Sequence, residues 1–570
     1  MSSDHRNALN AADSPKRFRV QPTPAGARAF DAVAQRVLII GLDGATFNVL
    51  NPLMAEGRMP NLKRVVDTGA SGILKSTIPP LTPAAWTTFL TGKQPGSHGV
   101  IDFEYYEIDT GLLRFHSTLS KDHVRAIWHI LGDHGFKVGS INVPMSYPPY
   151  KVNGFMVSGF ETPGPDSDFV YPAELKGEIL RRWPDPTLGT SWKRKVGGGD
   201  ELFAGNVDYM SRSFHQGAEM TAWLGDQHGW DVLMVVLKLV DNLQHKTWKY
   251  IDPRWSGRNP ARRDLVKRCF EELDKAVGSL LEYAQANQAT VIMVSDHGHG
   301  SQEGKVYPNE LLRRWGYLVL RPGLARLAGR ARRSLGRSSA TLTSGAAGGI
   351  EQHVPADLSR TRACVMHAGN AAFVYINLEG RQPTGIVKPS EYEALRDELK
   401  ARFLSDECTV RNPEGKKIRL FPEVHRPEDV YNCSRQDQPW LPDLMLIQHE
   451  TLAAVRKMRG RQTIRWLPYG RLEGTHRPEG IFIASGPGIV HTRDVNAQIA
   501  DCVPTILAMM GLRVPDDIEG RVITEIFETS PVVEMAKAGV QAAAEPAEEA
   551  YTADELQQVT DRLADLGYLE

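Results

Sequence analysis

Four short apolar runs, separated by segments with helical spacing, dominate the hydrophobic pattern of the chain. The runs are RVLIIGLDG (36–44), DVLMVVLKLVD (231–241), ATVIMVSDHGHG (289–300) and GIFIASGPG (480–488). Such continuous apolar runs are typical of strands buried on both faces of a parallel sheet. Residues 261–286 instead repeat apolar side chains every three or four positions, as an amphipathic helix does. The alternation predicts an α/β fold with a doubly wound, mostly parallel sheet flanked by helices.

The same pattern divides the chain into a core and less regular segments. Residues 1–35 are polar without a sustained period and predict a disordered N-terminal arm. The main domain is then expected at 36–528. The long intervals 102–230 and 301–470 are expected to hold insertions that form a cap.

Three further segments have a distinct composition. Residues 321–350 are basic and then rich in Ser, Thr, Ala and Gly, which predicts a flexible loop that is either simply solvated or an anion-binding lid. Residues 529–551 include an Ala/Glu-rich stretch and are interpreted as a linker. After them, 552–570 begin with the capping box of Thr552 and Glu555 and continue with an apolar stripe, which predicts a helix that docks back on the domain.

The composition excludes several classes of function. Because 67 basic residues balance 68 acidic ones, no net field attracts a nucleic-acid polymer or an anionic membrane. No uncharged apolar run of about 18 residues occurs, and the first residues lack a signal-peptide pattern, so we expect a cytoplasmic protein without stable membrane insertion. The oligomeric state is not indicated. Five widely spaced cysteines argue against a disulfide framework or a zinc-thiolate site: Cys269, Cys364, Cys408, Cys433 and Cys502.

In three of these segments an aspartate follows the apolar residues directly or within one or two positions: Asp43, Asp241 and Asp296. In an open parallel sheet the carboxyl ends of the strands share one edge, where ligands bind, so the three carboxylates are expected to meet there. Grouped carboxylates raise each other's pKa unless positive charge lies among them. A pair of divalent metal ions would supply that charge.

Histidines accompany these acids. His245 follows Asp241 by one helical turn, His297 follows Asp296 directly, and His476 precedes another apolar run. Asp and His ligands together suit zinc, or manganese. Each aspartate alone could be a turn former or a helix N-cap, so the prediction of a metal site depends on the whole set.

The motifs GLDGATF, TPAAWTTFLTG, DNLQH, SDHG and GTHR resemble, in this order, those of the alkaline phosphatase superfamily, in particular its type I phosphodiesterase and nucleotide pyrophosphatase branch. The resemblance covers about residues 36–527 and implies an alkaline phosphatase-like catalytic domain with two metal ions, usually zinc. It assigns one metal ion to Asp43, Asp296, His297 and the nucleophile, and the other to Asp241, His245 and His476.

The same resemblance points to Thr82 as the nucleophile, because the branch has its Thr ten residues before the Gly of a T-G pair, here Thr91-Gly92. A metal ion can lower the pKa of an oxygen acid by many units, which would activate the hydroxyl for attack on phosphorus. Thr46, close to Asp43, is the rival nucleophile. His98 is interpreted as a supporting histidine rather than a ligand.

The chain departs from the branch at Ala85, where nucleotide pyrophosphatases have an Asn that donates to a phosphoryl oxygen. Another donor must stabilise the transition state, or the activity differs. The candidates are Asn142, Lys238, Asn242 and backbone N–H groups after Thr82. Each of these side chains could instead be an ordinary turn or strand-edge residue.

The motifs together predict a metal-dependent phosphoric ester hydrolase that acts on diesters or pyrophosphates, with a small phosphoester or nucleotide-like substrate and a covalent phosphothreonine intermediate. A phosphomonoesterase or phosphomutase using the same site is the first alternative. The second is a non-catalytic scaffold that keeps the fold to bind metal or phosphate. The substrate itself cannot be read from the sequence, since the predicted insertions would determine it.

Overall fold

The computed structural model describes residues 29–107, 110, 112–117, 124–184, 186, 199–255, 257–321, 354–435, 438–538 and 551–566. Most of the predicted N-terminal arm, all of the predicted loop 321–350 except its first residue, and most of the predicted linker therefore lie outside the described residues, as do the last four residues of the chain.

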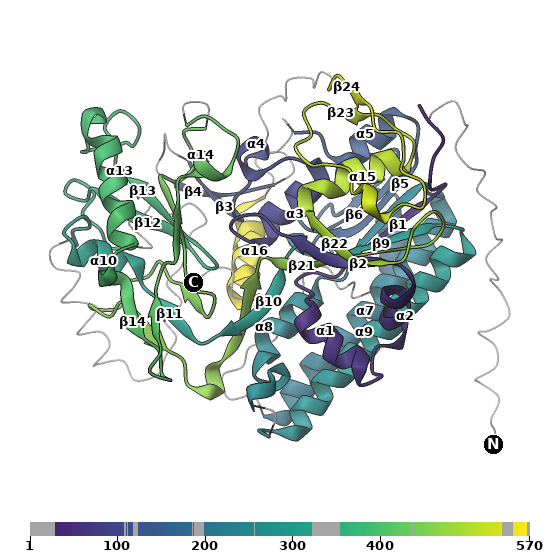
Figure 1. Ribbon diagram of the computed structural model, residues 1–570, viewed down its shortest axis with the longest axis horizontal. Helices are drawn as coiled ribbons and strands as arrows, with labels where there is room; N and C mark the ends of the chain where they lie inside the picture. The colour runs from purple at the N-terminus through teal and green to yellow at the C-terminus, as the bar shows by residue number, and fades with distance from the viewer. Residues whose placement is uncertain are drawn as a thin grey trace.

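A nine-stranded sheet forms the centre of the molecule (Figure 1). Strand β1 (Val37–Gly41) lies in its middle and pairs in parallel with β8 (Val232–Val236) on one side and β9 (Thr290–Val294) on the other. The predicted α/β fold with a mostly parallel sheet is thus confirmed. The strand order is β22 (Thr492–Gln498), β2 (Ala70–Lys75), β21 (Glu479–Ser485), β9, β1, β8, β5 (Val138–Val143), β6 (Gly154–Ser158) and β7 (Val170–Tyr171).

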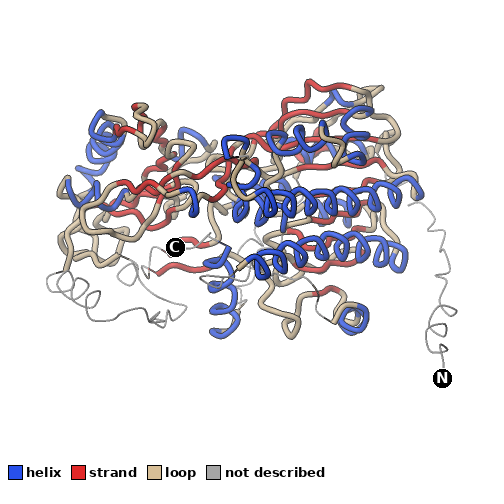
Figure 2. The backbone as a smooth tube through the Cα atoms, turned by 90° about the horizontal axis from the view of Figure 1, so that it is seen from below, coloured by secondary structure: helices blue, strands red, loops and turns tan. Residues whose placement is uncertain are grey.

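Both faces of this sheet are covered by helices, which explains the continuous apolar runs. In β1, Leu38 and Ile40 pack into one core, whereas Val37 and Ile39 pack into the core on the opposite face. The first core is closed by α1 (Phe47–Ala55), α2 (Pro60–Thr68), α7 (Asp200–His228), α8 (Leu239–Ile251) and α9 (Pro260–Ala286), and the long helices are clear in Figure 2. The second is closed by α3 (Thr82–Thr91), α5 (Ile127–Asp133) and α15 (Cys502–Met509).

Strand β21 runs against its neighbours β9 and β2, so the sheet is mixed. The residues that precede β21 consequently lie at the edge where β1, β8 and β9 end. This places His476, which comes three residues before β21, beside the aspartates. Strands β5, β6 and β7 fall within 102–230, so that interval contributes to the central sheet as well as to its surroundings.

A second, smaller layered region, which we call the accessory lobe, is formed by residues from the interval 301–470 (Figure 1, left). Its core is separate from the two cores of the main sheet and includes Phe373, Leu395 and Phe421. It consists of a sheet of β12 (Ala363–Ala368), β13 (Ala372–Ile376), β17 (Leu444–Ile447) and β16 (Glu423–His425), with helices α10 (Pro308–Arg314) and α13 (Pro389–Phe403).

Short sheets and helices complete the described chain. The pair β10 (Gly298–Gln302) and β20 (Glu473–Arg477) lies next to the main sheet and contributes to the site below. The others are β11 (Gly304–Val306), β18 (Leu452–Ala454) and β19 (Ile464–Trp466) in one sheet, the pairs β3 (Glu104–Glu107) with β4 (Leu112–Phe115), β14 (Thr409–Arg411) with β15 (Lys417–Arg419) and β23 (Val514–Pro515) with β24 (Met535–Ala536), and helices α4 (Pro95–His98), α6 (Leu175–Arg182) and α14 (Pro427–Val430).

Helix α16 (Ala553–Leu566) packs through Val559 and Leu563 against Phe103 and Phe160 of the main domain. Arg562 on this helix donates to the backbone carbonyls of Phe160 and Pro163. Within the described part of the chain, none of the helices has the length and apolar character needed to span a bilayer.

Candidate metal centre

The three predicted aspartates meet at the carboxyl edge of the central strands. Asp43 lies two residues beyond β1 and Asp296 two residues beyond β9. The prediction that Asp241 ends a strand is wrong, because β8 ends at Val236 and Asp241 lies in the first turn of α8. All three side chains are completely buried.

The donor atoms form two groups. The first contains Asp241, His245, His299 and His476, and the second contains Asp43, Asp296 and His297. The structure therefore brings together the six predicted carboxylate and imidazole ligands, divided as the resemblance implies. His299 is an additional member that sequence reasoning missed.

In the first group the histidines surround one carboxylate oxygen. Oδ1 of Asp241 lies 3.2 Å from Nε2 of His245, 3.4 Å from Nε2 of His299 and 3.5 Å from Nε2 of His476. The Nε2 atoms of His245 and His476 are 3.0 Å apart. Donors around a tetrahedral zinc ion, at about 2.1 Å from the metal, are separated by roughly 3.4 Å. The spacing thus matches a single small cation.

Each of the four histidines has Nδ1 within hydrogen-bond distance of a backbone carbonyl. The carbonyl partners are Gly474 for His245, Gly298 for His297, Gly44 for His299 and Pro80 for His476, at 2.8–3.0 Å. With Nδ1–H donated in this way, Nε2 keeps its lone pair toward the centre of the site. Metal-ligating histidines are held in the same manner.

Gly44 connects the two groups. Its N–H donates to Oδ1 of Asp296 at 3.0 Å, and its carbonyl accepts from the ring of His299 and from the side chain of Gln244. The residue has a φ of 69°, and a Cβ added to it would lie 2.8 Å from the His299 ring. Glycine is therefore required here for two reasons: the backbone has a positive φ, and there is no space for a side chain beside the His299 ring.

In the second group, Nε2 of His297 lies 3.3 Å from Oδ2 of Asp296 and 4.0 Å from Oδ1 of Asp43. The same nitrogen is 3.2 Å from the hydroxyl of Thr82. Thr82 is buried and is the first residue of α3, so its hydroxyl lies at the positive end of the helix dipole.

Two further side chains hold the acids in place. Nζ of Lys238 lies 2.6 Å from Oδ2 of Asp241 and 3.4 Å from Oδ1 of Asp43, so one ammonium bridges the two groups. Trp86 donates its indole N–H to Oδ2 of Asp43 at 2.8 Å. The Trp86 ring also packs in the core between α3 and the central sheet.

The charge of the cluster is not balanced by the protein. Burial, and then repulsion from Asp296, raises the pKa of Asp43 well above its ordinary value, and burial raises the pKa of Asp296 to about 7. For Asp241, burial acts upward, but contacts with Lys238 and His245 outweigh it and hold the pKa well below its usual range.

The buried histidines are in the form that binds metal ions. Burial lowers the pKa of His297 to about 3 and takes the pKa values of His299 and His476 well below the ordinary value. These rings are therefore neutral at neutral pH. In addition, Oδ2 of Asp296 and Nε2 of His299 are buried without a hydrogen-bond partner in the described part of the chain. The donor set thus fits two divalent cations.

The other predicted hydroxyls and His98 have local roles. Thr46 is the N-cap of α1 and accepts from the N–H of Asn48 at 3.4 Å. The ring of His98 accepts from the N–H of Val100 and lies 2.9 Å from the hydroxyl of Thr88, and it belongs to neither donor group.

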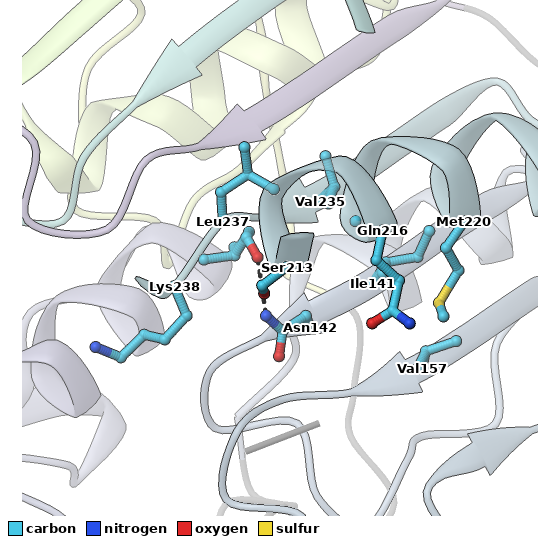
Figure 3. A pocket seen from close by; sticks show the side chains of 11 residues that line it. Ile141, Asn142, Val157, Ser213, Gln216, Met220, Val235, Leu237 and Lys238 are labelled. Atoms are coloured by element: carbon cyan, nitrogen blue, oxygen red, sulfur yellow. Dashed lines mark hydrogen bonds between the residues drawn. The ribbon is translucent and has the colours of Figure 1, made fainter. Parts of the chain in front are cut away.

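Of the three predicted substrate-binding residues, Lys238 contacts the acids, whereas the other two do not. Asn142, at a φ of 56°, donates to the carbonyl of Val236 at 2.9 Å. Asn142 and Lys238 line a cavity of about 30 Å³ together with Met220 and Val157, and the Lys238 ammonium points away from these two residues (Figure 3). Asn242 is completely buried in α8, and its side-chain amide has no hydrogen-bond partner among the described residues.

Comparison with known proteins agrees with this geometry. The model of the family "Type I phosphodiesterase / nucleotide pyrophosphatase" matches residues 37–478. The chain belongs to this family. Its members are hydrolases that act on phosphoester bonds, and they fall within the alkaline phosphatase superfamily. A comparison with curated proteins found no match.

Two solved structures of one phosphonoacetate hydrolase show the same fold at low identity. Phosphonoacetate hydrolase from Sinorhizobium meliloti 1021, in complexes with phosphonoformate and phosphonoacetate, is similar with TM-scores of 0.51 and 0.50 at 16% identity, over 82% of this chain and 94% of that one. Murine ectonucleotide pyrophosphatase/phosphodiesterase 5, inactive and in complex with AMP, has a TM-score of 0.46 at 11% identity, over 84% and 95% of the two chains.

Proposed function

We propose that this chain hydrolyses phosphoric diesters or pyrophosphates of small, nucleotide-like substrates, with Thr82 as the nucleophile. The observation that carries the proposal is the position of the Thr82 hydroxyl. It lies 3.2 Å from Nε2 of His297, at the edge of a buried donor group that also contains Asp43 and Asp296. A threonine hydroxyl is inert unless its environment favours the alkoxide, and this group is built to hold a cation beside it.

The proposed reaction has two displacements. The Thr82 hydroxyl loses its proton to solvent and its oxygen attacks phosphorus. The bond from phosphorus to the leaving oxygen breaks, the leaving oxygen takes up a proton, and a phosphothreonine ester forms. Water then attacks the same phosphorus, and the Thr82 oxygen leaves and regains a proton. Two bound divalent cations, zinc or manganese, would supply positive charge beside the phosphoryl group, and the one held by Asp43, Asp296 and His297 would lower the pKa of the attacking oxygens.

The residues of the chain orient these steps. Helix α3 presents Thr82 at its N-terminus, where the helix dipole favours the negative charge of a phosphoryl group. Lys238 adds a fixed positive charge between Asp43 and Asp241, and it can offset the charge that develops on the phosphoryl oxygens. The Lys238 ammonium is therefore the candidate donor to a phosphoryl oxygen, in place of the Asn that nucleotide pyrophosphatases have at the position of Ala85.

The test uses Thr82→Ala and Thr82→Ser with bis-p-nitrophenyl phosphate as substrate. We expect no measurable turnover for Thr82→Ala, partial activity for Thr82→Ser, and a phosphorylated residue 82 in acid-quenched wild-type protein by mass spectrometry. Thr46→Ala is the matched control, because Thr46 lies close to Asp43 but caps α1. Full activity of Thr82→Ala, or its loss in Thr46→Ala alone, would contradict the proposal.

Substrate class is tested by comparing bis-p-nitrophenyl phosphate with p-nitrophenyl phosphate, each with and without added zinc or manganese. The proposal expects the higher kcat/KM with the diester. A preference for the monoester would favour a phosphomonoesterase. Two bound metal ions without turnover of any ester in a broad panel would favour a binding protein.

A further inference from the structure

We infer that His299 is a fourth protein ligand of the cation bound by Asp241, His245 and His476. This would make that group a closed metal site, and would leave the group of Asp43, Asp296 and His297 as the one with an open position. The inference rests on the proposed two-metal function and refines it, because it separates a tightly held cation from an exchangeable one.

The position of His299 follows from strand pairing. His299 lies opposite His476 in the antiparallel pair β10 and β20, so both rings lie beside the same point of the main sheet edge. His297 and His299 are two residues apart and thus lie on the same side of the local extended chain. His297 reaches the second donor group, and His299 reaches the first.

The ring of His299 is oriented as a ligand. Nδ1 is 3.0 Å from the carbonyl of Gly44, so that nitrogen carries the proton and donates it there. The other nitrogen, Nε2, is completely buried, lies 3.4 Å from Oδ1 of Asp241, and has no hydrogen-bond partner in the described chain. A buried imidazole nitrogen with a lone pair and no donor costs free energy unless a cation binds it.

The number of donors determines the character of the site. Catalytic zinc sites keep three protein ligands and an open position, whereas four protein ligands close a tetrahedral site. Asp241, His245, His299 and His476 provide four, with spacings near those of a tetrahedron. The second group provides three acid and imidazole donors, and its remaining position lies beside the hydroxyl of Thr82, which bonds to phosphorus during the proposed reaction and therefore cannot close the site permanently.

The experiment measures how many metal ions the full-length chain retains. Wild type, His299→Gln and a control, His367→Gln, are loaded with zinc and dialysed against a weak chelator, and zinc per chain is then measured by mass spectrometry. His367 is also a buried histidine, but it lies in β12 of the accessory lobe. We expect wild type and His367→Gln to retain one zinc ion and His299→Gln to retain none, with a loss of affinity larger than the roughly 10–100-fold that removal of an outer hydrogen-bond partner causes.

Two readouts separate a ligand from a residue that only supports Gly44. If His299 binds the metal, His299→Gln lowers Tm much more in the zinc-loaded than in the metal-free protein, and the visible absorption of the cobalt-loaded protein changes in band position and intensity. Equal Tm losses in both states with an unchanged cobalt spectrum would overturn the inference. If His299→Gln does not fold, a crystal structure of the zinc-loaded wild type decides, because Nε2 must then lie about 2.0–2.1 Å from the metal.

Failure of this inference can be distinguished from failure of the proposed function. If wild type binds two zinc ions and forms the phosphothreonine, but His299→Gln retains zinc equally well, only the inference is wrong. If the wild-type chain binds no zinc in either group, both are wrong. If metal retention follows the prediction but residue 82 is never phosphorylated, the function is wrong and the closed site stands.

Discussion

Asp443 in the accessory lobe is as deeply buried as the three aspartates of the metal centre, but it is surrounded by cations. Arg381 binds it through two hydrogen bonds of 2.8 and 2.7 Å, and Arg435 adds a third at 2.7 Å. The hydroxyl of Tyr392 and the N–H of Ile376 also donate to it. Although burial acts to raise its pKa, Arg381 and Arg435 hold the pKa of Asp443 below its ordinary value.

The metal centre has the opposite balance. Among the side-chain contacts described, the Lys238 ammonium pairs with two of the three carboxylates, those of Asp43 and Asp241. Burial raises the pKa values of Asp43 and Asp296, and the one ammonium does not offset it. The charge of a buried carboxylate with two guanidinium partners is compensated within the protein, and such an ion cluster stabilises one arrangement of the lobe. Buried carboxylates with too few cationic partners require a cation from solution. The comparison therefore separates a structural ion cluster from a functional one.

The largest effect is expected from Asp296→Asn. The amide keeps an oxygen that can accept from Gly44, but it removes a charged donor of the second group. Bound metal ions stabilise the charge that develops in the transition state by several kcal/mol. Loss of this donor should therefore lower kcat/KM for the diester by about 10³-fold or more. The free energy of unfolding without metal should stay the same or rise, since one repelling carboxylate is gone. Urea unfolding in chelator checks this, and a clear loss of stability would contradict the comparison.

The second prediction concerns the accessory lobe. Arg381→Met leaves Asp443 with Arg435 as its remaining guanidinium partner, so we expect a destabilisation of about 3 kcal/mol, the low end of the cost of breaking a buried ion pair. Thermal and urea unfolding measure the loss. Activity per folded molecule at low temperature should be unchanged, because Asp443 belongs to neither donor group. A loss of activity without a loss of stability would show that the two clusters are coupled.

The third prediction is a difference in pH dependence between the two donor groups. Asp296 has a pKa of about 7, so in the metal-free chain it is increasingly protonated as the pH falls below 7 and must release that proton to bind a cation. Protonation of Asp296 alone should thus lower the affinity of the second group by up to about tenfold per pH unit below 7, and Asp43, whose pKa is also raised, adds to this fall. Of the first group, His299 and His476 are already neutral there and Asp241 is already ionised, so these three donors bind a cation without releasing a proton.

Calorimetric zinc titrations at pH 6 and pH 8, each in two buffers with different ionisation enthalpies, count the protons released. One binding event should release more protons at pH 6 than at pH 8, and for the other event the difference should be smaller. Two events with the same pH dependence would be evidence against the difference between the groups.

Much of this could be predicted from the sequence, because local pattern and order along the chain carry the information. The buried strands, the long helix at 260–286 and the choice of the six acid and imidazole residues that the structure groups together needed only apolar runs, spacing and motif order. The placement of Asp241 was wrong by one element, since the apolar run continues from β8 through Leu237 into the first turn of α8.

What could not be predicted depends on pairing between distant segments. The antiparallel direction of β21 follows from a connection through the whole accessory lobe, and it decides that His476 lies at the same edge as Asp43. The role of His299 depends on its register with His476 in the pair β10 and β20. The repeat of His at 297 and 299 was the available sequence signal, because residues two apart in an extended chain share one side.

The smallest expected effect is that of Trp86→Phe, which tests whether a residue of the hydrophobic core also positions Asp43 for metal binding. The substitution keeps an aromatic ring in the core of α3 but removes the N–H that donates to Oδ2 of Asp43. Partners of this kind orient metal ligands, so we expect about tenfold weaker zinc binding at the second group, the low end for such losses. Phe89→Leu is the matched control, since Phe89 is buried in the same helix and packs edge-on against Trp86. It should lower stability without changing zinc affinity. If both variants weaken zinc binding equally, the packing of α3 rather than the indole hydrogen bond positions Asp43.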